Sequence, residues 1–130
     1  MPTALLLTLG LHTAAAAFWL LSSLVLGFSG NPSASKALFR PQMVGATLAV
    51  FTGGGLWQML HASGFGRPEA VLALGSLLAV AAAGVQGAMV GGAIRRLPDP
   101  AAAGRIKPGQ RIAAALLAGA LICMMVERYV

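Results

Sequence analysis

Four long apolar runs, separated by short polar stretches, make up most of the chain. The first run, Ala4 to Phe28, carries no formal charge and contains a single histidine. Because about 20 apolar residues in a helix cross the roughly 30 Å hydrocarbon core of a bilayer, this run predicts a membrane-spanning helix. The same argument predicts three further spans, at about Gln42 to Ala62, Glu69 to Ile94 and Arg111 to Val126.

Residues with turn chemistry mark the breaks between these runs: Gly30, Asn31, Pro32, Gly64, Gly66, Pro68, Pro98 and Pro100. Pro41 stands in the first turn of the second predicted helix, where a proline costs no hydrogen bond. Short connections make successive helices antiparallel. We therefore expect an all-α, up-down-up-down four-helix transmembrane bundle that forms a single domain over residues 1–130.

The composition excludes a water-soluble fold. Hydrophobic residues make up 58% of the 130 residues and charged residues only 9%, whereas about a quarter of a soluble domain is charged. The three acidic residues, Glu69, Asp99 and Glu127, all lie at the edges of the runs. No pair of carboxylates can therefore act as acid and base inside the membrane. The sequence also lacks a P-loop, a CxxC and an HExxH motif, so an enzymatic role is not expected.

The basic residues indicate how the helices are oriented. The first and third connections hold seven of the nine lysines and arginines, while the second connection and the C-terminus hold Arg67 and Arg128. Positive loops stay in the cytoplasm, so this count predicts that both termini lie outside it. The residue usage is typical of a high-GC bacterium, which predicts the bacterial inner membrane. No basic face with interleaved aromatic residues is present, so the expected partners are lipids and not nucleic acid.

Two histidines are the strongest candidates for chemistry. His12 lies inside the first predicted helix on a face with Trp19, and an ionisable residue within the membrane is costly. His61 ends the second helix on the same side of the membrane, two turns after Gly54. Imidazole is an axial ligand of haem iron, and glycine leaves room for the macrocycle. The sequence therefore predicts a bis-histidine haem b site at His12 and His61, with Gly54 and Trp19 beside it.

Depth is the difficulty for a haem shared by the two histidines. At about 1.5 Å per residue, His12 lies ~12 Å inside its span and His61 within ~2 Å of the end of the other. Two other interpretations stay open. His12 could bond a neighbouring helix while His61 lies among the headgroups, or the histidines could serve another metal, a quinone or proton transfer.

The stretch from Leu11 to Trp19 has an early histidine, small residues and a tryptophan seven positions after the histidine. It resembles the first helix of the copper-resistance D-type membrane proteins, and it is similar to the related haem-binding protoporphyrinogen oxidase membrane family. Arg40 before a glycine-containing second helix fits the same pattern. Leu20 stands where those families have a glycine, and the third predicted helix lacks their lysine. The resemblance implies that His12 handles haem or copper.

Amides and small residues suggest how the helices meet. Gln58 and Gln86 are expected to form hydrogen bonds between helices, or else to contact a substrate or quinone. Small residues at four-residue spacing predict close packing, either within the bundle or against another subunit: Gly45, Ala49 and Gly53, then Gly87 and Gly91, then Ala115 and Gly119. A further possibility is copper(I) at the soft ligands Cys123, Met124 and Met125.

These features favour a small non-catalytic subunit or anchor of a membrane redox complex. It would hold haem b through His12 and contact other membrane subunits, or itself, through the small-residue stripes. The alternative is a stand-alone small oligomeric transporter or channel, for which the sequence offers a sparse polar pathway. A third interpretation is an assembly factor without a cofactor.

Overall fold

The computed structural model describes residues 2–130, and within that range the chain contains helices and no strand. Each of four helical segments is long and apolar enough to cross a membrane. They are α1 (Thr3–Ser29), α2 (Pro32–His61), a third segment made of α3 (Arg67–Val85), η1 (Gln86–Gly91) and α4 (Gly92–Ile94), and α5 (Pro100–Val126) with the final turn η2 (Glu127–Tyr129). The predicted four-helix transmembrane bundle is confirmed.

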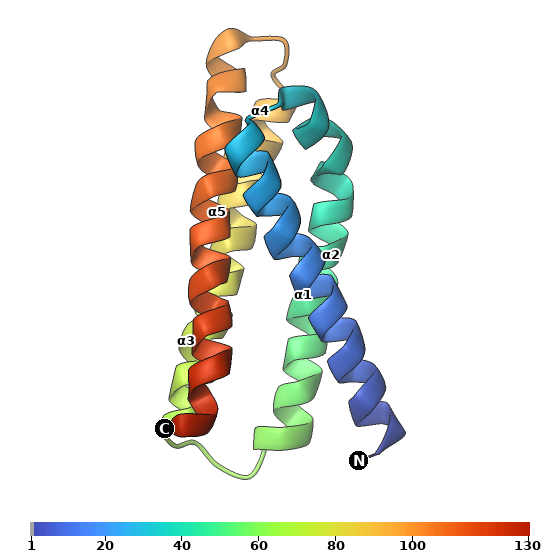
Figure 1. Ribbon diagram of the computed structural model, residues 1–130, viewed down its shortest axis with the longest axis vertical. Coiled ribbons are helices and arrows are strands. Elements are labelled where there is room, and N and C mark those ends of the chain that lie inside the picture. The colour runs from blue at the N-terminus through green and yellow to red at the C-terminus, as the bar shows by residue number, and fades with distance from the viewer. Residues whose placement is uncertain (1) are drawn as a thin grey trace.

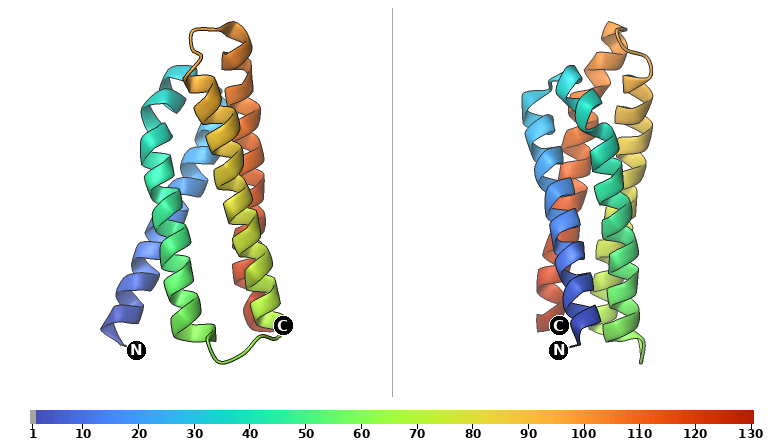
Figure 2. Two further views of the ribbon diagram at one scale, coloured as in Figure 1. Left: turned by 180° about the vertical axis from the view of Figure 1, so that it is seen from behind. Right: turned by 90° about the vertical axis from the view of Figure 1, so that its right-hand side faces the viewer.

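The helices run alternately up and down, so both termini lie at the same end (Figure 1). α1 packs mainly on α2 and α5, and α3 packs mainly on α5, while α2 and α3 touch less. The N-terminal half of α1 leans away from α3 and α5, as Figures 1 and 2 both show. α1 is therefore nearer to α5 towards the Gly30–Asn31 turn than towards the termini.

α2 and α5 begin earlier than the hydropathy predicts, at Pro32 instead of Gln42 and at Pro100 instead of Arg111. Each start carries a side-chain cap. The Asn31 Oδ1 accepts from the backbone amides of Ser33 and Ala34, and the Asp99 Oδ1 accepts from that of Ala101. Both prolines follow their cap at the first helical position, where the missing N–H costs no bond.

These early starts place two prolines inside helices. Pro41 lies within α2, and not in its first turn as predicted, and Pro108 lies within α5. The predicted first connection shortens to Gly30 and Asn31. Gly30 has a φ of 61°, and its amide bonds the Leu26 carbonyl, which ends α1.

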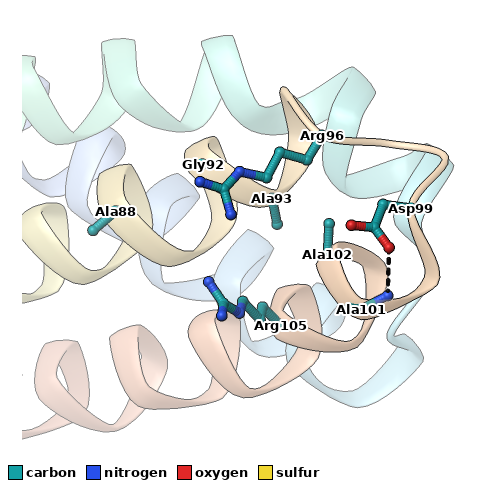
Figure 3. Close-up of a pocket in the computed structure, with 8 residues that line it drawn as sticks. All are labelled: Ala88, Gly92, Ala93, Arg96, Asp99, Ala101, Ala102 and Arg105. Atoms are coloured by element: carbon teal, nitrogen blue, oxygen red, sulfur yellow. Dashed lines mark hydrogen bonds between the residues drawn. The ribbon is translucent and has the colours of Figure 1, made fainter.

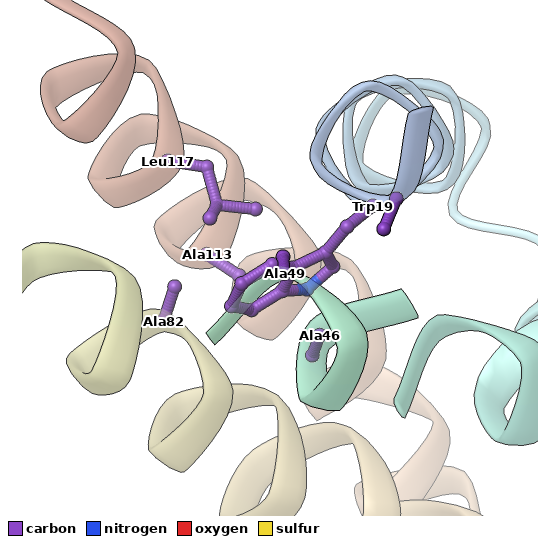
Figure 4. Close-up of a cluster of buried hydrophobic side chains, with 7 residues drawn as sticks. Trp19, Ala46, Ala49, Ala82, Ala113 and Leu117 are labelled. Atoms are coloured by element: carbon purple, nitrogen blue, oxygen red, sulfur yellow. The ribbon is translucent and has the colours of Figure 1, made fainter. Parts of the chain in front are cut away.

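Small side chains let the helices approach closely in the core. Trp19 is the one large residue of the main cluster, and Figure 4 shows it surrounded by Ala46, Ala49, Ala82, Ala113 and Leu117. A second cluster of Val90, Ala93, Ala102 and Ile106 lies nearer the Pro100 end. In lipid this kind of packing holds helices together, because apolar burial alone gives little preference for protein over lipid.

The glycine stripe of α2 is used within the chain. A Cβ at Gly45 would lie 3.1 Å from Phe18, and one at Gly53 would lie 3.2 Å from His12, so both glycines face α1. Gly87 has open space around it and Ala115 is exposed. Contact of those two positions with another subunit stays a prediction.

Candidate functional site

Polar side chains from all four helical segments meet at one level inside the bundle. We call this group the polar node and define it as Trp19 and Ser22 with Ser23, Gln42, Gln86 and Gln110. Ser23 and the three glutamines have no exposed surface, and Trp19 is 1% exposed. Such burial is tolerated only when each polar group finds a partner.

Gln86 is the centre of the node. Its Oε1 accepts from the indole Nε1 of Trp19 at 2.5 Å. Its Nε2 donates to the Ser23 Oγ at 2.7 Å and to the Gln110 Oε1 at 3.0 Å. One side chain of the third segment is thereby bonded to both α1 and α5.

Gln42 and Gln110 form a reciprocal pair between α2 and α5. The Gln42 Nε2 donates to the Gln110 Oε1 at 3.3 Å, and the Gln110 Nε2 returns a bond to the Gln42 Oε1 at 3.2 Å. The Gln42 Nε2 also lies 3.1 Å from the Ser22 Oγ. Ser23 completes the set by donating to the Trp19 carbonyl at 2.7 Å.

The node is closed on itself. In residues 2–130, the only fully buried side-chain polar atom without a partner is the Ser35 Oγ, which lies outside the node. The node therefore has no unsatisfied buried group that would need a substrate, an ion or a quinone. Its evident role is to fix the positions of all four segments relative to one another.

A π-helical turn begins at Gln86 and continues to Gly91. Such turns insert one residue into a helix and rotate the residues beyond the insertion about the helix axis. Gln86, Val90 and Ala93, spaced four and three residues apart along this stretch, are all buried. Gly91 lies so close to Phe39 of α2 that a Cβ would come within 2.6 Å of the ring.

His12 lies on α1 about two turns from the node, where only α2 holds it. Its Nδ1 is 2.9 Å from the backbone carbonyl of Ala49 and 3.1 Å from the Thr52 Oγ1. The Thr52 hydroxyl donates to the Leu48 carbonyl at 2.5 Å. Because a carbonyl can only accept, Nδ1 must carry the proton, and a neutral His12 then has its lone pair on Nε2.

The Nε2 atom of His12 has no hydrogen-bond partner among residues 2–130, and it is not one of the fully buried unpartnered atoms. It is therefore at an accessible position on a partly buried side chain. Gly53 allows this arrangement, because a Cβ there would lie 3.2 Å from the imidazole Cε1. The site offers one oriented imidazole whose second nitrogen can donate its lone pair to a metal ion or accept a hydrogen bond.

His61 is held in a different place. Its Nδ1 lies 2.8 Å from the Glu69 Oε1, across the connection between α2 and α3. The other oxygen of Glu69 accepts from the Gly66 amide at 2.8 Å and so caps α3. His61 is nine residues beyond Thr52 on α2, or about 13 Å along the axis. The structure thus does not bring His12 and His61 together.

The remaining predicted residues lie in different parts of the bundle. Trp19 lies in the node, while Gly54 is exposed, with nothing near its Cβ position. The prediction of an interhelical bond is confirmed for Gln86 and wrong for Gln58. Gln58 lies on an exposed face of α2, and its side chain forms no hydrogen bond within the described range 2–130. In that same range no group of three or more histidine, cysteine or acidic side chains could hold a metal ion.

Two glutamines of the node are not predicted from the sequence. Gln42 and Gln110 lie where the hydropathy places a helix start and a connection, so they do not read as intramembrane amides. A signal exists nonetheless, since small or apolar residues follow each at offsets of three, four and seven: Gly45, Ala46 and Ala49, then Ala113, Ala114 and Leu117. That pattern puts each glutamine on the packed face of its helix.

Comparison with known proteins adds no further constraint, because no protein family, no curated protein and no solved structure matches the chain.

Proposed function

We propose that the chain is a non-catalytic subunit or anchor of a membrane redox complex, and that His12 is an axial ligand of haem b. The observation that carries the proposal is the bond from the His12 Nδ1 to the Ala49 carbonyl at 2.9 Å. It fixes the ring and leaves the lone pair of Nε2 available. A haem held there would supply one-electron transfer within the membrane.

Glycines of α2 lie beside His12 and leave space on that face of the helix. Gly53 touches the imidazole, and Gly54 and Gly55 follow it on α2 with no atom closer than 3.7 Å to a Cβ at either position. α1 leans away from α3 and α5 at this end of the bundle (Figure 1). Haem needs only one imidazole from a given chain, so the lack of a larger ligand cluster does not argue against it.

A haem iron held by His12 would need a second axial ligand from this chain or from a partner. His61 remains the candidate within the chain, and reaching His12 would require the Glu69 contact to break and α2 to shift by more than two turns. A ligand from a partner subunit requires neither change. We therefore propose that His12 is the one ligand this chain supplies, and that the partner side of the haem lies outside it.

The polar node supports a subunit over a transporter or channel. Its amides bond one another and leave no line of free polar groups through the bundle. A conducting path needs exchangeable polar contacts along its length. For localisation we propose the bacterial inner membrane with both termini outside the cytoplasm, from the excess of basic residues at the opposite end. A reporter enzyme fused to the C-terminus and active only outside the cytoplasm tests that orientation.

The test of haem binding uses the full chain purified in mild detergent. Wild-type protein is expected to show a Soret band, and His12→Ala is expected to lose it. His61→Ala is the matched control, because it removes an imidazole at the same end of the bundle and should keep the band. Gln58→Ala, at an exposed position, controls for handling of the variants.

Two results would overturn the haem proposal: a colourless wild-type protein after reconstitution with haem, and a band that survives in His12→Ala. A band lost equally in both histidine variants would overturn the proposal that the second ligand lies outside the chain. The subunit proposal has its own readout, which is co-purification with larger membrane proteins. A homo-oligomer that carries ions or solutes across liposomes would contradict it.

A further inference from the structure

A small cavity lies at the end of the bundle opposite the termini, between the end of the third segment and the start of α5. Arg96 and Arg105 line it, and Figure 3 shows both guanidinium groups turned towards the space between the two helices. Asp99 also lines it, so the lining carries two positive charges and one negative charge. Small residues form the rest of the wall: Ala88, Gly92, Ala93, Ala101 and Ala102.

The cavity is large enough for a phosphate group. Its volume is about 120 Å³, whereas one water molecule needs roughly 10–15 Å³ by the same kind of measure. Gly92 leaves part of this space free, because a Cβ built there meets nothing within 4 Å. The space exists because the facing residues are small, and larger side chains would fill it.

The charge of the cavity is not balanced within the chain. Asp99 uses its Oδ1 to cap the Ala101 amide. The only ion pair in residues 2–130 is the one between His61 and Glu69, at the other end of the bundle. Arg96 and Arg105 therefore have no carboxylate within salt-bridge distance. Two guanidinium groups without an acidic partner favour an anion with several oxygens, such as a phosphate.

The cavity lies where lipid headgroups are expected. The third segment has 28 residues, which is about 42 Å and exceeds the roughly 30 Å hydrocarbon core. Arg96 follows the end of that segment, and Arg105 is five residues into α5. Both side chains are exposed. We therefore expect both arginines at the level of the phosphates of a leaflet, where basic pockets between membrane helices bind anionic lipids.

We propose that Arg96 and Arg105 bind the headgroup phosphate of an anionic phospholipid in this cavity. The lipid would lie between the third segment and α5 and would link their ends. This inference does not depend on haem binding at His12. It assigns a specific lipid site to two arginines among the many cations at this end of the bundle.

The test measures lipid retained by the full chain in mild detergent, using native mass spectrometry with phosphatidylglycerol as the probe and phosphatidylcholine as the uncharged comparison. Wild-type protein is expected to prefer phosphatidylglycerol. The double variant Arg96→Gln with Arg105→Gln should weaken that binding at least about tenfold, because each of the two basic residues adds to the attraction for an anionic headgroup. The matched control pair, Arg95→Gln with Lys107→Gln, removes the same charge at the same end but not from the cavity, and should weaken binding much less.

A second variant tests the cavity without changing the charge. Gly92→Leu should fill the space and reduce phosphatidylglycerol binding, whereas Gly10→Leu, at another glycine with open surroundings, should not. Equal losses in the two charge pairs, or unchanged binding in Gly92→Leu, would overturn the site. Displacement of the lipid by inorganic phosphate or glycerol phosphate at the same concentration as the lipid would overturn the assignment to a lipid. Size-exclusion profiles check that every variant stays folded.

Discussion

The polar node and the His12 contact are two ways of placing a polar side chain inside the same membrane bundle. The node joins all four helical segments, and its groups bond only one another. His12 is joined to α2 alone, and one of its ring nitrogens has no partner in the described chain. A closed set of bonds stabilises a fold, whereas an oriented group with a free lone pair is suited to a ligand. The node therefore has a structural role, and His12 is the residue for which we propose a ligand.

Removing Gln86 from the node should give the largest effect. Gln86→Leu breaks three bonds between helical segments, each worth roughly 0.6–1.7 kcal/mol in membrane proteins, so a loss of about 2–4 kcal/mol in the free energy of unfolding is expected. Gln58→Leu, at the exposed amide of α2, should change stability by less than about 0.5 kcal/mol. Unfolding in mixed micelles of increasing SDS content measures both. Equal effects of the two substitutions would contradict the role of the node.

The packing beside the node gives a second test with two neighbouring glycines. Gly91→Ala places a Cβ within 2.6 Å of the Phe39 ring, so a loss of about 1–3 kcal/mol is expected from overpacking. Gly92→Ala meets nothing within 4 Å and should be neutral or slightly stabilising, because alanine favours helix. The same unfolding assay compares them. If Gly91→Ala proves as stable as Gly92→Ala, α2 and the π-turn do not touch as described.

The contacts of His12 with a single helix, α2, should contribute less to stability than the node does. His12→Ala removes contacts with α2 only, and an effect near 1 kcal/mol is expected. A drop as large as that of Gln86→Leu would mean that His12 is structural, which would contradict the division between the two regions. Unfolding without added haem keeps ligand binding from adding to the difference.

The caps at the early helix starts should give the smallest effects of this set. Asn31→Ala removes two bonds to the start of α2, and Asp99→Ala removes one from the start of α5. Losses of about 0.5–1 kcal/mol are expected, with Asn31→Ala the larger. Amide hydrogen exchange over the first turns of both helices locates the change. No local increase in exchange in either variant would place the helix starts elsewhere.

The fold could be predicted from the sequence because hydropathy reports on the part of each helix that lies in lipid. The starts of α2 and α5 could not be predicted, because each helix begins in a charged stretch that precedes its apolar run. Lys36, Arg40, Arg105 and Lys107 all lie on such extensions. A charge ends an apolar run without ending a helix. The Asn31 and Asp99 caps were the available signal for the true starts.

The candidate site was predictable in part. The predicted face of α1 that holds His12 and Trp19 does point inward, since Trp19 is buried and His12 contacts α2. The node could not be assembled from the sequence, because it depends on which level of α2 and α5 meets Gln86. The separation of His12 from His61, by contrast, agrees with the different depths that the sequence indicates for them, ~12 Å and ~2 Å from the ends of their predicted spans. Pairing of positions on different helices is a property of packing, and hydropathy does not encode it.

Finding which ring nitrogen of His12 carries the proton is the sharpest test of its role as a ligand. Nitrogen-15 NMR of the histidine-labelled protein without haem, in lipid and with His61→Gln to leave one signal, distinguishes the two neutral tautomers. The bond to the Ala49 carbonyl predicts a proton on Nδ1 and a bare Nε2. A proton on Nε2 with a bare Nδ1 would contradict that bond, and with it the assignment of His12 as the ligand of this membrane protein.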